Sequence, residues 1–318
     1  MSVSTQCRFV GLFLLLILAF CGMNASFAAS NKEKQVAIVQ IVEHPALDAT
    51  RQGILDELKN QSITIKFQSA QGNSGLATQI AQQFVGSSPD VMVGIGTLVT
   101  QALISANQNH QIPIVFSSVT DPQGSKIVNN LEHPEGVVTG VSNFVDPGLQ
   151  FDLFKQILPK LTKLGIIYNP GEANAVILNE KMQSIAKQKG LELIFATANT
   201  TADVAQSAQQ LAPKVDAMFI NNDNTALSAF ESIVKIATQH KIPVFCSDTD
   251  MVAHGALAAL GPNQYEIGRQ TGKMILQILD GKSPSQIPVS FPDKTEVLVN
   301  PEQAEKLGIQ IPQELIKK

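Results

Sequence analysis

Carboxylates directly follow two apolar segments in the second half of the sequence. Asp223 comes soon after residues 217–220, and Asp248 and Asp250 follow residues 243–246. If the two segments are strands of one parallel sheet, these carboxylates gather at one edge and could bind a cationic group such as an ammonium. Helix capping by Asp223, and capping or a turn at Asp248, are the simpler alternatives.

Hydroxyl groups follow apolar segments in the first half in the same way. One loop contains Thr97, and another contains Ser118, Thr120 and Asp121. Hydroxyls and backbone amides at such places are suited to an anion. A ligand with both an ammonium and a carboxylate would satisfy both halves, with its carboxylate on Thr97 and its ammonium on the aspartates.

An internal repeat supports two similar halves. HQIPIVFSSVTD at residues 110–121 resembles HKIPVFCSDTD at residues 240–250, so we interpret both as one supersecondary unit used twice. Around them, apolar segments alternate with amphipathic segments, which predicts parallel sheets in an α/β fold. The expected strands are 36–42, 63–67, 91–95, 163–168, 192–196, 217–220, 243–246 and 255–260. The expected helices are one from Asp48 or Thr50 to about residue 60, those over 76–85, 149–158, 175–189 and 265–279, and one after residue 196 that ends at residue 211.

Length and composition favour a globular protein with two domains, since the chain has 318 residues, 44% of them hydrophobic. A net charge of −4 without a basic block argues against a nucleic-acid partner. No CxxC or HExxH spacing is present, so we expect no metal. The GIGT loop lacks the third glycine of a dinucleotide motif, and we expect no cofactor.

Catalysis is not indicated either. Ser117 and Ser118 lack a nucleophile-elbow sequence. Cys246 stands in an apolar segment, where a buried small side chain is a simpler interpretation than a nucleophile. Without a base, nucleophile or metal set, the sequence predicts a protein that is not an enzyme.

The first residues predict export. Arg8 is followed by an uncharged apolar run over residues 9–21, and Ser26 and Ala28 supply the small residues of a cleavage site. We therefore expect a signal peptide over residues 1–28. An uncleaved membrane anchor and a lipid anchor at Cys21 remain as alternatives, although the bulky Phe20 departs from the lipid-attachment pattern.

Several segments together form a family pattern, among them VAIVQIVEHPALDATRQGI, FVGSSPDVMVGIGT, LGIIYNPGEANA, VDAMFINNDNT and GALAALGPNQYEIGRQTGKM. With these segments, the chain resembles the ABC-transporter substrate-binding protein family related to tryptophan and other aromatic amino-acid binding lipoproteins. The resemblance implies a type I periplasmic binding fold, in which two doubly wound parallel-sheet lobes are joined by a three-segment hinge. One lobe would comprise residues 29–142 and 261–287, and the other 143–260 and 288–318.

The same resemblance implies a function and a site. The chain would be the exported receptor of an ABC importer, monomeric, with permease subunits as partners. Its ligand would be a small amino acid, aromatic or branched-chain, with Phe116, Phe144, Tyr168 or His44 available for ring contacts. A sensor that presents the ligand to a membrane receptor kinase would share every feature. The ligand-binding residues implied are Glu43, His44, Thr97, Ser118, Thr120, Asp121, Asn174, Asp223, Asn224 and Asp248.

Overall fold

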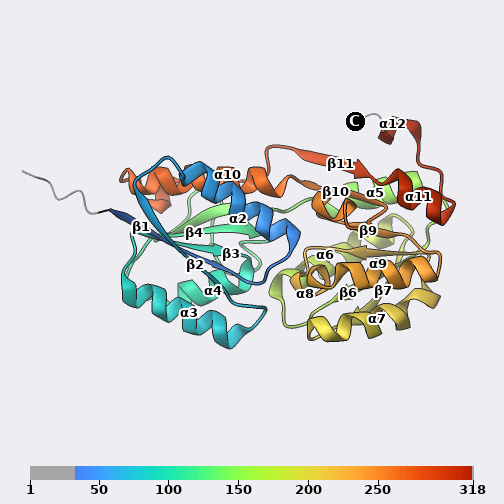
Figure 1. Cartoon of the computed structure of the whole chain (residues 1–318), viewed down its shortest axis with the longest axis horizontal. Coiled ribbons are helices and arrows are strands. Elements are labelled where there is room, and N and C mark those ends of the chain that lie inside the picture. The colour runs from blue at the N-terminus through green and yellow to red at the C-terminus, as the bar shows by residue number, and fades with distance from the viewer. Residues whose placement is uncertain (1–32, 317–318) are drawn as a thin grey trace, which may run out of the picture. The chain divides into compact units, whose positions relative to one another are not determined.

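The structure is a computed structural model that describes residues 33–316. The expected signal peptide, its cleavage site and Cys21 lie outside the described residues. Strands and helices alternate along the described chain. The strands form two sheets, and helices cover both faces of each sheet (Figure 1). We call each sheet with its helices a lobe. This α/β architecture of two doubly wound lobes confirms the predicted fold class.

Lobe I is built on five parallel strands in the order β2-β1-β3-β4-β5. Helices α2 and α10 cover one face of this sheet, and α3 and α4 cover the other (Figure 1). The strands are β1 (Lys34–Gln40), β2 (Ile63–Ser69), β3 (Val91–Ile95), β4 (Ile114–Val119) and β5 (Val138–Ser142). The helices are α2 (Pro45–Leu58), α3 (Ser74–Ser87), α4 (Thr97–Ala106) and α10 (Gln264–Leu279).

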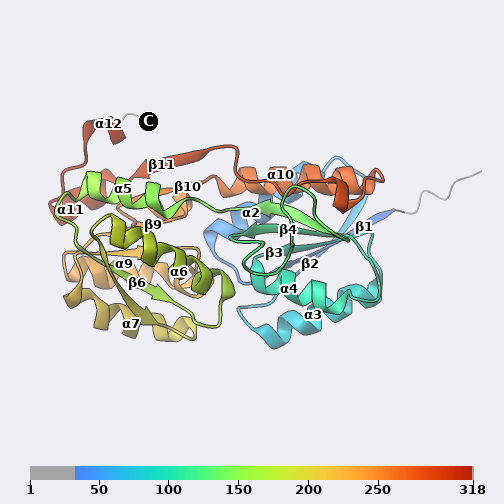
Figure 2. The same cartoon turned by 180° about the vertical axis from the view of Figure 1, so that it is seen from behind.

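Lobe II has six strands in the order β11-β10-β9-β8-β6-β7, parallel except for β11. Helices α5 and α6 cover one face, and α7 and α9 cover the other (Figure 2). The strands are β6 (Lys163–Tyr168), β7 (Glu192–Thr197), β8 (Ala217–Ile220), β9 (Val244–Cys246), β10 (Ala258–Pro262) and β11 (Thr295–Val299). The helices are α5 (Pro147–Ile157), α6 (Ala173–Gln188), α7 (Val204–Leu211), α8 (Asn224–Ser228), α9 (Phe230–Gln239), α11 (Pro301–Leu307) and α12 (Gln313–Ile316).

The central strands are buried on both faces, which explains their unbroken apolar sequences. Every residue of β3, β4, β8 and β9 is buried. In lobe II, Phe154 stacks on Phe245 with ring centroids 4.2 Å apart. Cys246 is fully buried in β9, as expected for a packing residue.

The predicted repeat is present in the structure. The strand orders β2-β1-β3-β4-β5 and β7-β6-β8-β9-β10 are the same pattern, with β4 and β9 in equivalent positions. The turn before each of these strands contains a residue in the left-handed region, Gln111 with φ of 59° and Lys241 with φ of 58°. The two halves are thus alike in backbone conformation as well as in sequence.

Three connections join the lobes. The chain leaves lobe I after β5, returns between Pro262 and the start of α10, and leaves again after Ser290, which still pairs with Val141 in the first sheet. Within the connection from β5, Phe144 donates its backbone N–H to the Ser142 hydroxyl at 3.1 Å. Three crossings of this kind are the hinge of the predicted fold; the exact lobe boundaries stay a prediction.

Some element boundaries differ from the prediction. The first helix was expected to begin at Asp48 or Thr50, but α2 begins at Pro45, whose fixed φ suits the first helical position. Two helices follow β8, because Ala229 has φ of −114° and separates α8 from α9. The strand expected over 255–260 is β10 and begins three residues later, at Ala258, because Gly255 has φ of 102°.

Candidate functional site

A cavity lies where strand-end loops of the two lobes meet. Lobe I contributes residues from the ends of β1, β3, β4 and β5 and from α10, and lobe II contributes loops after β6, β8 and β9. The cavity is lined by His44, Ala46, Leu47, Thr97, Ser118, Thr120, Asn143, Asn174, Asn222, Asn224, Leu227, Asp248 and Gln264. Most of these side chains are polar, and the volume is about 10 Å³, enough for a single water molecule.

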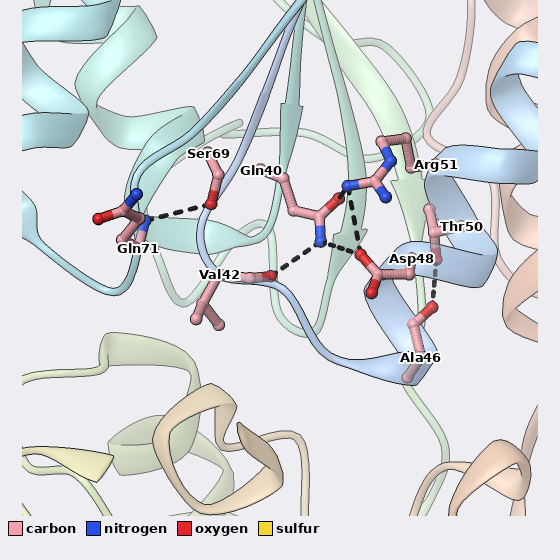
Figure 3. A network of polar contacts seen from close by, with 8 residues as sticks. All are labelled: Gln40, Val42, Ala46, Asp48, Thr50, Arg51, Ser69 and Gln71. Carbon is pink, nitrogen blue, oxygen red and sulfur yellow. Dashed lines mark hydrogen bonds and ion pairs between the residues drawn. The ribbon is translucent and has the colours of Figure 1, made fainter. Parts of the chain in front are cut away.

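Gln40 holds the loop that carries His44 (Figure 3). Its buried amide donates to Val42 O and to Asp48 Oδ1, both at 2.8 Å, and accepts from Arg51 Nη1 at 3.0 Å. Arg51 also lies 3.2 Å from Asp48 Oδ1. This network fixes the turn between β1 and α2, so Asp48 stabilises the loop rather than capping the helix.

His44 is a buried neutral imidazole at the cavity wall. It is 4% exposed, and burial lowers its pKa to about 4, against the opposing effect of its contact with Asn224. Nε2 lies 3.4 Å from Asn224 Oδ1 of lobe II, whereas Nδ1 has no hydrogen-bond partner within the described chain. An unsatisfied buried nitrogen in a cavity lining is available to a ligand.

Two hydroxyl residues of lobe I depend on special backbone. Thr97 begins α4 after Gly96, where φ is 101° and an added Cβ would lie 2.7 Å from Ile41 Cγ2, so glycine is required there. Ser118 has φ of 54° at an irregularity in the pairing of β4 with β5. Such strain in a non-glycine residue is characteristic of functional sites, and here it turns the Ser118 hydroxyl toward Gln264.

Asp248 presents a carboxylate to the cavity from lobe II. It is 2% exposed, and burial raises its pKa to about 7, with Asp250 nearby adding to the rise and the Gln264 hydrogen bond opposing it. Gln264 Nε2 donates to Asp248 Oδ1 at 2.5 Å, and Gln264 Oε1 accepts from Ser118 at 3.0 Å and Thr50 at 3.1 Å. A buried carboxylate with one neutral partner is well suited to receive a cation.

Asp223 has a different role. Its carboxylate accepts from the backbone N–H groups of Asn169 and Ala226, both at 2.7 Å, which caps α8 and ties β6 to it. Burial and the neighbouring Glu172 carboxylate raise the pKa of Asp223. Asp223 does not line the cavity, and its observed contacts are those of a helix cap.

Glu172 holds the loop that contains Asn224. It is 6% exposed and accepts from the backbone N–H and side-chain amide of Asn224 at 3.0 and 2.6 Å. Its other oxygen accepts from the N–H and hydroxyl of Thr225 at 2.9 and 2.8 Å. Both carboxylate oxygens of Glu172 therefore accept hydrogen bonds from lobe II.

Direct contacts close the cavity between the lobes. Asn222 Nδ2 donates to Thr120 Oγ1 at 3.1 Å, and Asn222 Oδ1 accepts from Ser247 at 2.5 Å. At the outer edge, Lys181 Nζ pairs with Asp121 Oδ2 at 2.5 Å. The structure thus shows the two lobes in contact around the site.

Seven of the ten predicted binding residues come together here, and three do not. His44, Thr97, Ser118, Thr120, Asn174, Asn224 and Asp248 line the cavity. Glu43 is exposed beside it, Asp121 forms the ion pair with Lys181, and Asp223 caps α8. Whether the ten bind a ligand stays a prediction.

Sequence reasoning missed three polar lining residues. Asn222 follows β8 in the same polar segment as Asp223, so its position after a buried strand could have predicted it. Asn143 and Gln264 lie at crossings between the lobes, where position depends on the assembled hinge. Of the rings expected near the ligand, Phe116 is fully buried, Tyr168 packs on Phe195, and Phe144 contacts Lys181; His44 alone lines the cavity.

Residues 33–316 contain no group of acidic, His or Cys side chains arranged to hold a metal ion. Within the same residues, no helix is long and apolar enough to cross a membrane.

Two parallel-sheet lobes that meet around a polar cavity define a two-lobed solute receptor of the type I periplasmic binding fold. The chain belongs to the family described as ABC transporter substrate binding protein, whose sequence pattern matches residues 35–318. This family comprises non-enzymatic solute receptors that act outside the cytoplasm, in agreement with the expectation of no catalysis.

Particular relatives extend the comparison. The tyrosine-binding protein of Clostridioides difficile strain R20291 is 32% identical over 314 residues, covering 94% of this chain and 90% of that protein. The ABC domain from Streptococcus pneumoniae in complex with L-Trp is 32% identical with a TM-score of 0.86, covering 90% and 98% of the two chains. A ligand-free, open substrate binding protein from Clostridium difficile is 34% identical with a TM-score of 0.66, covering 88% and 96%.

Proposed function

We propose that this chain is the exported receptor of an ABC importer and that it binds an amino acid with a free ammonium and carboxylate in the cavity between its lobes. The observation that carries the proposal is Asp248, a buried carboxylate that faces the cavity with the Gln264 amide as its hydrogen-bond partner. An ammonium group would supply the positively charged partner that this carboxylate lacks. Relatives described as tyrosine-binding or bound to L-Trp support an amino-acid ligand.

The opposite side of the cavity suits the carboxylate of the same ligand. Thr97 begins α4, a ten-residue helix, so its hydroxyl lies at the positive end of a helix dipole. Helix N-termini bind anions through free backbone N–H groups. Thr97 and Asp248 come from different lobes, so a zwitterion would contact both. An aromatic amino acid is the ligand we favour over a branched-chain one, because of those two relatives.

Binding would proceed by closure of the hinge. The fold agrees better with the L-Trp complex, at a TM-score of 0.86, than with the open ligand-free protein, at 0.66. With a volume of about 10 Å³, the cavity has no room for the ammonium and carboxylate of an amino acid, so the lobes must lie further apart both when a ligand enters and when it is bound. In this scheme lobe I comprises residues 29–142 and 261–287, and lobe II comprises 143–260 and 288–318, in a monomer.

Export and partnership complete the proposal. Cleavage after Ala28 would release the mature receptor, with a lipid anchor at Cys21 as the alternative, and permease subunits would accept the ligand from the closed lobes. Fractionation of the tagged full-length chain, with mass measurement of the mature N-terminus, separates these forms. Uptake of labelled ligand by cells with and without the gene separates transport from delivery to a receptor kinase.

Calorimetry on residues 29–318 tests the binding function. We expect one of the aromatic amino acids to bind the wild type, and Asp248→Asn to weaken it by about 2 kcal/mol or more, since an ammonium then loses its charged partner. Glu192→Gln, which removes an exposed carboxylate of lobe II that does not line the cavity, is the control and should bind normally. Equal affinity in the wild type and Asp248→Asn would refute the ammonium site.

A further inference from the structure

A second cavity lies between the lobes, beside the first. It has a volume of about 230 Å³, against about 10 Å³ for the polar cavity. Lobe I contributes the end of β1, the loop before α3, and α4; lobe II contributes the loops after β6 and β7, and α8. Asn224 belongs to the linings of both cavities, and so forms the partition between them.

The two walls of the second cavity differ in chemistry. The lobe I wall includes the apolar side chains of Ile41, Val42 and Leu98. Val42 points away from the Gln40 network that holds its backbone (Figure 3). The lobe II wall is polar, with amides and hydroxyls from Asn169, Asn199, Thr201, Thr225 and Ser228. A flat group with an apolar face and a polar edge would match both walls.

Within the described chain, several hydrogen-bonding groups of the polar wall already have partners in lobe II. Glu172 is its only ionisable lining residue, and both of its oxygens already accept hydrogen bonds from Asn224 and Thr225. Asn169 likewise donates to Thr225 Oγ1 at 2.9 Å and accepts from the Gly171 N–H at 2.8 Å. The Glu172 carboxylate would repel an anionic ligand group, and a cationic group would have to displace the hydrogen bonds that already occupy both of its oxygens, so the cavity favours a neutral group.

We propose that this second cavity takes the aromatic side chain of the ligand, while the polar cavity holds the ammonium and carboxylate. This assignment rests on the proposed amino-acid binding. The polar cavity alone has no room for an aromatic ring. The side chain of tyrosine or tryptophan buries roughly 150–250 Å² of its own surface, and it needs an apolar wall to pack against. Asn224, fixed by Glu172 and in contact with His44, would then lie against the point where side chain and ammonium group join.

A third cavity, of about 270 Å³, also adjoins the site and is the rival location. Lobe I gives it only the three consecutive residues from Glu43 to Pro45. Its lining contains the exposed carboxylates of Glu43 and Glu231 and the imidazole of His254, which pairs with Glu231 at 3.1 Å. Charged groups of this kind suit solvent better than a neutral ring.

The experiment uses L-tryptophan as its probe. The chain contains two tyrosines and no tryptophan, so the emission of the bound ligand, excited at a wavelength that tyrosine does not absorb, can be followed without protein background. For the wild type we expect binding with a shift of this emission to shorter wavelength, as the ring leaves water for the apolar wall. Val42→Phe and Thr201→Phe each add bulk to the second cavity, from lobe I and from lobe II.

Both filling variants should weaken L-tryptophan binding by about tenfold or more, because the added ring takes up the space that the ring of the ligand would occupy. The matched control is Ser232→Phe, which adds the same ring to the third cavity from an exposed position and should leave binding within about twofold. Thr201 is also exposed, so Thr201→Phe decides the question if Val42→Phe does not fold.

The outcomes separate the two proposals. If the wild type binds no aromatic amino acid, the proposed function fails, and this inference with it. If the wild type binds but both filling variants bind equally well, the inference alone is overturned. Loss of binding in Ser232→Phe with normal binding in the other two would place the ring in the third cavity and overturn it as well.

Discussion

Gln264 Nε2 donates to Asp248 Oδ1 at 2.5 Å, and this hydrogen bond joins the two lobes at the edge of the polar cavity. Asp248 follows β9 of lobe II, whereas Gln264 begins α10, which packs on lobe I. On the far side, Gln264 Oε1 accepts from Ser118 and Thr50, at 3.0 and 3.1 Å. The acceptor role of Oε1 leaves Nε2 to donate, so the orientation of the amide is fixed.

Gln264→Leu is expected to weaken ligand binding by about 2 kcal/mol, because Asp248, Ser118 and Thr50 would lose a buried partner at once. Calorimetry with the ligand measures the effect. Gln303→Leu is the matched control, since Gln303 is also a buried glutamine and donates to Thr238 within lobe II. It should cost stability without a comparable loss of affinity; similar affinities in the two variants would contradict the role given to Gln264.

Ligand affinity should depend on pH through Asp248. Its pKa is raised to about 7, and an ammonium ligand pairs with the charged carboxylate, so affinity should fall about tenfold per pH unit below 7 and level off above it. His44, with a pKa of about 4, stays neutral over this range, and Asp250, whose pKa is also raised, is the other carboxylate near Asp248. Calorimetry in buffers of different ionisation enthalpy should show release of a proton on binding near pH 6.

The ligand-free protein should respond in the opposite direction. A carboxyl group with a raised pKa holds its proton more tightly in the folded state, so its contribution to stability is lost as pH rises from about 4 to about 7. Asp248→Asn removes this titration, so it should flatten the affinity profile and reduce the pH dependence of stability, to which Asp223 and Asp250, whose pKa values are also raised, still contribute. An Asp248→Asn variant that kept the full pH dependence of affinity would show that another group is responsible.

Asp223→Ala should chiefly lower stability. The variant loses the cap of α8 and leaves the Asn169 N–H without its acceptor, which together should cost about 2 kcal/mol of unfolding free energy. Urea denaturation measures this loss. Asp203→Ala, which removes an exposed capping contact with Thr200, is the control and should cost less. A large loss of affinity at unchanged stability would instead support the direct ligand contact expected from sequence.

The contrast between Asp223 and Asp248 shows what the sequence could predict. Both follow buried strands in one parallel sheet, and that rule placed them at the correct edge. Their roles depend on which donors the carboxylate meets: Asp223 meets two backbone N–H groups of its own lobe, whereas Asp248 meets an amide from the other side of the hinge. No local pattern encodes that difference.

The same limit applies to the missed residues. The repeat, the strand order and the hydroxyls of Thr97 and Ser118 follow from periodicity and strand ends, which are local signals. Gln264 stands in an amphipathic helix, where a polar residue in the first turn reads as solvent-exposed until the packing of α10 on α2 is known. The second cavity exists only between assembled lobes.

Lys181→Ala should shift the lobes toward the open state by a small amount. Lys181 on α6 of lobe II pairs with Asp121 of lobe I, but its side chain is 45% exposed, so we expect a loss of at most about 1 kcal/mol, or up to about fivefold in affinity. Lys189→Ala is the matched control, because Lys189 directly follows α6 but pairs with Asp152 of its own lobe.

Small-angle scattering of the ligand-free protein should show a larger radius of gyration for Lys181→Ala than for Lys189→Ala. The difference should shrink at high salt, which screens the exposed pair. Equal radii in the two variants at low salt would mean that the ion pair does not help to close the lobes, and that the buried contacts of Asn222 with Thr120 and of Gln264 with Asp248 do so without it.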